Sequence, residues 1–181
     1  RLRDNALARA AAGDQGAQAV IDAINQSGVI GQDREFAFIG FCPGGDISFR
    51  QDRKWIAEGI CEFGIIESGV QHRRFAGIVP GDLLILKKRE QFGETMRLYG
   101  HGRVSEVLTI GGRLGVQWNT DAGEIVIPLM GCNGTVDIRS IETVEAEAPQ
   151  EFWDWLGFNG KVALPLLPRF RTTKSPAEHF C

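Results

Sequence analysis

The stretch FAGIVPGDLLILKK, residues 75–88, decides the fold. Pro80-Gly81-Asp82 predicts a tight turn, because proline presets the backbone for one turn position and glycine accepts the positive φ of the next. The run from Leu83 to Lys88 is short and apolar, which predicts a strand directly after the turn. The flanking sequence repeats this pattern of short strands and turns on both sides.

Five further segments resemble strands, and glycine-rich or polar turns separate several of them. They are EFAFIGFC (35–42), RLYGHGRVSEVL (97–108), RLGVQW (113–118), EIVIPLM (124–130) and TVDIRS (135–140). Strands of this length and spacing are typical of a small barrel or sandwich. The segment from Trp55 to Ile60 fits a helix or a strand equally well. We therefore predict an α+β fold, mainly β, with short peripheral helices.

The composition divides the chain into three parts. Residues 1–34 are Ala-rich with helical spacing and predict a helical N-terminal extension. Residues 35–160 form the predicted strand-rich domain. Within it a short helix is expected after Pro149, ending at Gly157 and presenting Phe152, Trp153 and Leu156 as a docking face. Residues 161–181 are proline-rich and predict an irregular tail.

The charge is unevenly distributed. The 181 residues carry a net charge of −3, yet residues 50–103 contain ten Lys or Arg and seven Asp or Glu. An anionic partner would therefore favour this central region, although ordinary solvated charge is the equally weighted alternative. The four cysteines and three histidines lack metal-ligand spacing. We expect no metal, no cofactor, no membrane segment and a cytoplasmic location.

No complete catalytic motif is present, so we expect a protein that is not an enzyme. The chain lacks a GxSxG nucleophile turn, a phosphate-binding P-loop and an HExxH zinc motif. His101 lies between glycines and could act in acid–base chemistry, but a strand-bend role is more common. Residues Gly131–Gly134 form either a tight turn or a loop whose N–H groups approach a ligand.

Aromatic and basic residues interleave at four places in the chain. Nucleic-acid binders need this pairing, because cations neutralise phosphate and flat rings stack on bases. The candidate nucleic-acid-binding residues are Arg53, Lys54, Trp55, Arg73, Arg74, Lys87, Lys88, Tyr99, His101, Arg103, Trp118, Asn119 and Asp121.

The order of these elements resembles the PUA-like superfamily, in particular its EVE and ASCH-type members found in modification-dependent restriction systems. The resemblance rests on Pro80-Gly81-Asp82-Leu83-Leu84-Ile85 and Gly100-His101-Gly102-Arg103-Val104 and covers roughly residues 35–145. It implies a small mixed β-barrel whose pocket accepts an extruded, often modified, base of DNA or RNA. By this analogy Trp55 and Trp118 line the pocket, and Asn119 or Asp121 reads the base edge.

Three functions follow as hypotheses. The first is a nucleic-acid recognition domain, able to read a modified or flipped base, within a larger defence or RNA-processing protein. The second is a protein-interaction module that docks through the helix bearing Trp153 and Trp155. The third is a small-molecule sensor or small enzyme that uses His101 and the Gly131–Gly134 loop.

Overall fold

The computed structural model describes residues 35–64, 69–90 and 93–157. The predicted N-terminal extension (1–34) and C-terminal tail (161–181) lie outside the described residues. In chain order the elements are β1 (Glu35–Gly40), η1 (Pro43–Gly45), η2 (Ile47–Phe49), α3 (Asp52–Glu58), β2 (Ile60–Glu62), α4 (Gly69–Ala76), β3 (Leu83–Glu90), β4 (Thr95–Thr109), β5 (Arg113–Trp118), β6 (Ile125–Pro128), β7 (Val136–Ser140), α5 (Ile141–Glu147) and α6 (Gln150–Trp155).

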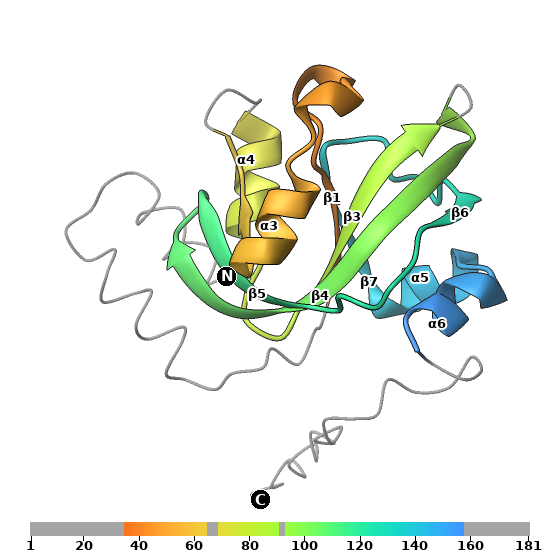
Figure 1. Cartoon of the computed structure of the whole chain (residues 1–181). Helices are drawn as coiled ribbons and strands as arrows, with labels where there is room; N and C mark the ends of the chain where they lie inside the picture. The colour runs from red at the N-terminus through yellow and green to blue at the C-terminus, as the bar shows by residue number, and fades with distance from the viewer. Residues whose placement is uncertain (1–34, 65–68, 91–92, 158–181) are drawn as a thin grey trace, which may run out of the picture.

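The strands form one mixed sheet in the order β2-β5-β4-β3-β1-β7, and β6 pairs with β4 beside this path (Figure 1). The pair β1–β3 is parallel, and the other described pairs are antiparallel. The predicted α+β, mainly β class is therefore confirmed. The closed barrel is wrong for the described strands, because the path ends at β2 and β7. Separate layers cover the two faces of its central strands, so closure around one interior is unnecessary.

The predicted turn before β3 is confirmed in detail. The Asp82 N–H donates to the Val79 carbonyl at 3.1 Å, which closes a four-residue turn. Gly81 has φ +97°, which suits the third position of a type II turn after proline. The buried Asp82 carboxylate accepts from the backbone N–H groups of Val79 at 2.9 Å and Glu35 at 3.3 Å. This carboxylate therefore links the turn to the start of β1.

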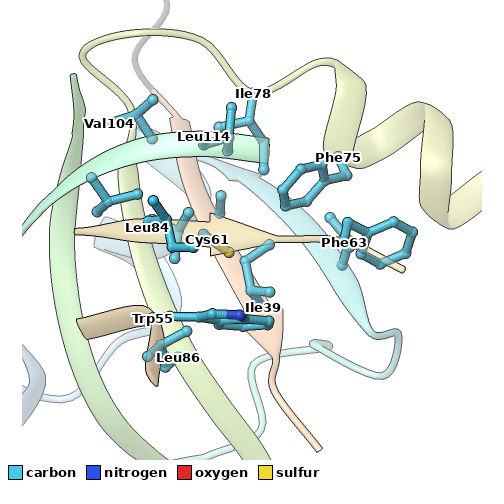
Figure 2. Close-up of a cluster of buried hydrophobic side chains, with 14 of the residues drawn as sticks. Ile39, Trp55, Cys61, Phe63, Phe75, Ile78, Leu84, Leu86, Val104 and Leu114 are labelled. Atoms are coloured by element: carbon cyan, nitrogen blue, oxygen red, sulfur yellow. The ribbon is translucent and has the colours of Figure 1, made fainter. Parts of the chain in front are cut away.

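Strands β1 and β3 are buried on both faces, which explains their continuous apolar sequences. In β1, Ala37 and Ile39 face one core, while Phe36 and Phe38 face the other. Helix α3, helix α4 and strands β2 and β5 contribute to the first core, including Trp55, Cys61, Phe75 and Leu114 (Figure 2). The sheet thus has a different covering layer on each face.

The second core is built against helix α6. Phe152 is fully buried and its ring centroid lies 6.0 Å from that of Phe36 and 6.2 Å from that of Phe38. Trp153 is only 5 % exposed and makes an edge contact with Phe36. The helix after Pro149 is confirmed, and its predicted docking face packs on its own sheet. This burial removes the observation that suggested Trp153 as an anchor for a protein partner.

The segment that the sequence left undecided contains a helix and a strand. Helix α3 ends where Gly59 adopts a left-handed conformation, with φ +68°, and strand β2 begins at the next residue. A left-handed glycine is a common helix stop, because it lacks the Cβ that would clash. Among the described helices, none combines the length and the hydropathy that a membrane crossing requires.

Candidate functional site

Arg50 is the centre of a cluster at the edge of the first core. Its guanidinium donates twice to the Asp52 carboxylate, with Nε–Oδ1 at 2.7 Å and NH2–Oδ2 at 2.5 Å. The same guanidinium lies 5.1 Å from the ring centroid of Tyr99 and 5.8 Å from that of Phe41. We call Phe41, Arg50, Asp52 and Tyr99 the Arg50 cluster. The carboxylate and the rings fix the guanidinium in position.

A β-bulge places Tyr99 in the Arg50 cluster. Leu86 pairs with Gly100 and Lys87 pairs with Leu98, so Tyr99 is the extra residue of β4. A bulge re-aims the side chain at the extra position and is common beside functional sites. The Tyr99 ring makes an edge contact with Phe41 at 4.7 Å and stays half-buried. Its flat ring and the Arg50 guanidinium therefore share one surface.

The loop that carries Arg50 is closed by backbone hydrogen bonds. The Gln51 N–H donates to the Phe41 carbonyl at 2.9 Å, so the loop leaves and returns at almost the same place. Inside it, the Asp46 carboxylate accepts from the N–H and the hydroxyl of Ser48, both at 2.8 Å. These bonds lower the pKa of Asp46. Figure 1 shows this loop standing out from the end of β1.

Two cations border the Arg50 cluster. Lys88 lies on β3, one residue after the position opposite the bulge of β4. It is close enough to Cys42 and Asp46 to lower their pKa values. Arg53 is exposed on helix α3, where it directly follows Asp52 of the cluster. Within the described residues, neither Lys88 nor Arg53 makes an ion pair. The Lys88 ammonium and the Arg53 guanidinium therefore remain available to an anion.

Lys87, the neighbour of Lys88, has a different environment. It is 2 % exposed and donates to the carbonyls of Cys132 and Gly134 at 2.6 and 2.7 Å. Its third bond is to the Asp137 carboxylate at 2.8 Å. All three ammonium protons are therefore used inside the protein. This corrects the sequence-based placement of Lys87 on a nucleic-acid-binding surface.

The same network explains the Gly131–Gly134 loop. The Cys132 N–H donates to Leu129, and the Gly134 N–H donates to Asp137 at 2.8 Å. Asn133 N–H donates to the Gly131 carbonyl. The N–H groups of Cys132, Asn133 and Gly134 therefore donate to carbonyl and carboxylate oxygens of the protein itself, as expected of the tight turn.

His101, Asn119 and Asp121 lie close together, on strand β4 and just after strand β5. His101 Nε2 lies 3.1 Å from Asn119 Nδ2, and the Asp121 N–H donates to Asn119 Oδ1 at 3.1 Å. However, His101 is 7 % exposed and its ring packs edge-on against Trp155 at 4.6 Å. Burial lowers the pKa of His101, partly offset by its hydrogen bond to the Trp155 backbone. The His101 side chain therefore holds helix α6 to the sheet.

The two tryptophans assigned to a pocket are core residues. Trp55 is 5 % exposed within the first core. Trp118 is partly buried and its indole N–H donates to the Ile60 carbonyl at 3.1 Å. Burial of Trp55 removes its ring from the surface, which corrects its assignment as a pocket residue, while Trp118 is held against the core by its indole N–H.

The remaining predicted cations are dispersed over the surface. Lys54 pairs with Glu62 at 3.4 Å, and Arg74 binds Asp137 and the Val136 carbonyl. Arg103 donates to the Gly81 carbonyl at 3.0 Å, and Arg73 is exposed on α4. The structure therefore gathers Arg53, Lys88 and Tyr99 from the predicted set around one cluster and distributes the rest.

The thiols of this region are poorly suited to nucleophilic chemistry. Burial raises the pKa values of Cys42, Cys61 and Cys132, and Lys88 and Lys87 only partly offset this at Cys42 and Cys132. A thiol with a raised pKa holds little reactive thiolate at neutral pH. Over residues 35–64, 69–90 and 93–157, no group of three or more His, Cys, Asp or Glu side chains is placed to hold a metal ion.

Sequence reasoning missed the centre of this site. Arg50 and Phe41 were not candidates, because the aromatic and basic residues were paired by adjacency along the chain. The available signal was Arg50 followed two residues later by Asp52 at the start of a helix, a spacing that allows a local ion pair. The partner ring, Tyr99, is far away in sequence.

The comparisons with known proteins add no relative. No protein-family model matches the chain, and neither a curated protein nor a solved structure shows significant similarity to it.

Proposed function

We propose that this domain binds nucleic acid at the Arg50 cluster. The observation that carries the proposal is the guanidinium of Arg50, fixed by Asp52 over the rings of Phe41 and Tyr99. Lys88 and Arg53 near it make no ion pair with any residue that the structure describes. Arginine planes and aromatic rings stack on bases, while free cations neutralise phosphates. One surface thus offers both contacts that a nucleotide requires.

Two cations near the Arg50 cluster are available to an anionic ligand. Asp52 is 2 % exposed and already satisfied by Arg50, so it contributes little repulsion. Asp46 accepts two hydrogen bonds from Ser48. Glu124 and Glu90 also act on Tyr99, and Arg97 pairs with both glutamates. Lys88 and Arg53 are therefore the cations of this region that an anionic ligand can reach without displacing an ion pair of the described residues.

The finer assignment to a PUA-like domain that reads a modified or flipped base is part of the same proposal. The turn at Pro80-Gly81-Asp82 and the strand bearing Gly100 and Gly102 support it, because the pair β3–β4 carries both Lys88 and Tyr99, two residues apart in the register. A flipped base costs a few kcal/mol to unstack, and aromatic and guanidinium planes offset that cost.

Oligonucleotide binding at graded salt concentrations tests the proposal. The measurement is fluorescence anisotropy of the 181-residue chain with short single-stranded and duplex oligonucleotides, each with and without modified bases. We expect binding at low salt that weakens as salt rises, because bound phosphates release counterions. Absence of binding at low salt, or an affinity that is indifferent to salt, would reject nucleic acid as the ligand.

A tyrosine pair locates the site. Tyr99→Ala removes the ring and should weaken binding about tenfold or more, as expected for a lost stacking contact. Tyr99→Phe is the matched control, because the phenol hydroxyl makes no hydrogen bond to a described residue. If both variants bind as tightly as the wild type, the Arg50 cluster is the wrong surface.

A further inference from the structure

The turn from Ile47 to Phe49 exposes apolar side chains beside the Arg50 cluster. Phe49 is 61 % exposed and Ile47 is 42 % exposed, although most large apolar side chains of the described domain are buried. Removing a phenylalanine ring from water is worth about 1.5–3 kcal/mol, so this exposure forgoes stability within the domain. A ligand that covered the ring would recover it.

The backbone of this loop is organised although its side chains are not buried. The Phe49 N–H donates to the Asp46 carbonyl at 3.1 Å, and the Arg50 N–H donates to the Ile47 carbonyl at 3.2 Å. Gly44 and Gly45 adopt positive φ values of 63° and 77°, which let the chain turn tightly before the exposed residues. Phe49 is thus held by hydrogen bonds in a position next to Arg50.

We propose that Phe49 is a stacking platform for an unpaired base of single-stranded nucleic acid. This inference rests on the proposed function and adds a residue that the Arg50 cluster does not include. Charge favours this occupant over a protein segment, because Lys88 acts on Asp46 of the same loop and makes no ion pair within the described residues. A ring with cations beside it matches a base followed by its phosphate.

The test uses fluorescein-labelled oligo-dT and oligo-U, twelve nucleotides long, and the full chain. Phe49→Ala should weaken binding of either strand by about 5- to 150-fold, the effect of losing one stacked base. Phe49→Trp should bind as tightly as the wild type or more tightly, because it keeps a flat ring. Phe49→Leu is apolar without a ring and should bind as weakly as Phe49→Ala. Oligo-dT and oligo-U distinguish a DNA strand from an RNA strand as the ligand.

Leu108→Ala is the matched control. Leu108 is an apolar residue near the C-terminal end of β4, 39 % exposed and nine residues beyond Tyr99 along the strand. We expect this variant to bind both oligonucleotides like the wild type.

The outcomes separate the two proposals. If the wild type shows no salt-dependent binding, the proposed function fails. If the wild type binds and Phe49→Ala binds equally, only the stacking role fails. Restoration by Phe49→Leu, or loss of self-association by Phe49→Ala without any change in oligonucleotide affinity, would likewise overturn the role, because either result assigns Phe49 an apolar protein contact.

Discussion

Lys87 and Lys88 are neighbours on strand β3 with opposite environments. The Lys87 side chain is buried and donates to Cys132, Gly134 and Asp137, whereas Lys88 lies beside the Arg50 cluster without an ion pair among the described residues. Successive side chains of a strand point to opposite faces of the sheet, so two adjacent lysines have one buried ammonium group and one at the edge of the Arg50 cluster. Counting the charges of residues 50–103 treated the two as equivalent.

The largest effect expected from this comparison is on stability. Lys87→Ala removes the Lys87 donor from the buried Cys132 carbonyl and the part-buried Gly134 carbonyl, and leaves Asp137 with its Arg74 partner and the Gly134 N–H. Removing one side of a buried charged network costs about 3–5 kcal/mol. Lys88→Ala should change the free energy of unfolding by less than about 0.5 kcal/mol. Urea unfolding followed by tryptophan fluorescence measures both, and similar losses in the two variants would contradict the comparison.

The second effect concerns the shape of the Arg50 side chain. Arg50→Lys keeps the charge but loses the planar fork that Asp52 and the two rings hold. Affinity for the oligonucleotides should fall by about 5- to 30-fold, or about 1–2 kcal/mol, because an ammonium group cannot stack.

Arg113→Lys is the control for this substitution. Arg113 pairs with Glu62 at 3.3 Å at the start of β5, away from the Arg50 cluster. Equal affinities of Arg50→Lys and the wild type would show that position 50 contributes only its charge.

The difference between the two lysines also shows what the sequence could reveal. The strands and the Pro80-Gly81 turn were predictable, because alternation and turn chemistry are local. The parallel pairing of β1 with β3 was not, since it depends on segments more than 40 residues apart. Helix α4 was missed because GVQHRRFA contains few apolar residues and buries only Phe75. Lys87 was misplaced because its acceptors come from residues 132–137.

The candidate site was harder to predict than the strands for the same reason. Lys88, Arg53 and Tyr99 were named from their residue types, yet nothing local separates them from Trp55, Lys87 and Trp118. The decisive facts are a bulge at Tyr99 and a loop that returns Arg50 to Phe41. Both depend on tertiary structure, in which three segments distant in sequence meet.

The third prediction isolates the charge of Lys88. Lys88→Ala should weaken oligonucleotide binding at low salt and reduce the slope of log affinity against log salt by about 0.7–0.9, the share of one phosphate contact. Its effect on affinity should shrink as salt rises, because the lost contribution is electrostatic. Arg113→Ala should leave the slope unchanged. A slope for Lys88→Ala equal to that of the wild type would place this lysine outside the interface.

The smallest effect belongs to His101, a second polar group that is buried like Lys87. Burial lowers the pKa of His101 in the folded protein, while the unfolded chain has an ordinary value of about 6.5. Below that value the unfolded state binds more protons, so stability falls as the pH falls. The loss ends at the lower pKa of the folded state, and above about pH 7 the stabilisation is complete.

Urea unfolding at pH 7.5 and 5.5 measures this dependence, in a range above the titration of ordinary carboxylates. We expect the wild type to lose more stability between these pH values than His101→Gln, whose amide oxygen can still accept from Asn119. Lower pH should also weaken the contact between the His101 ring and Trp155, because a protonated, charged imidazole is unfavourable in this buried position against α6. Equal losses in the two proteins would mean that the pKa of the imidazole is the same in the folded and the unfolded state. This end of the sheet would then tolerate a positive charge, whereas the buried charge of Lys87 has three hydrogen-bond acceptors.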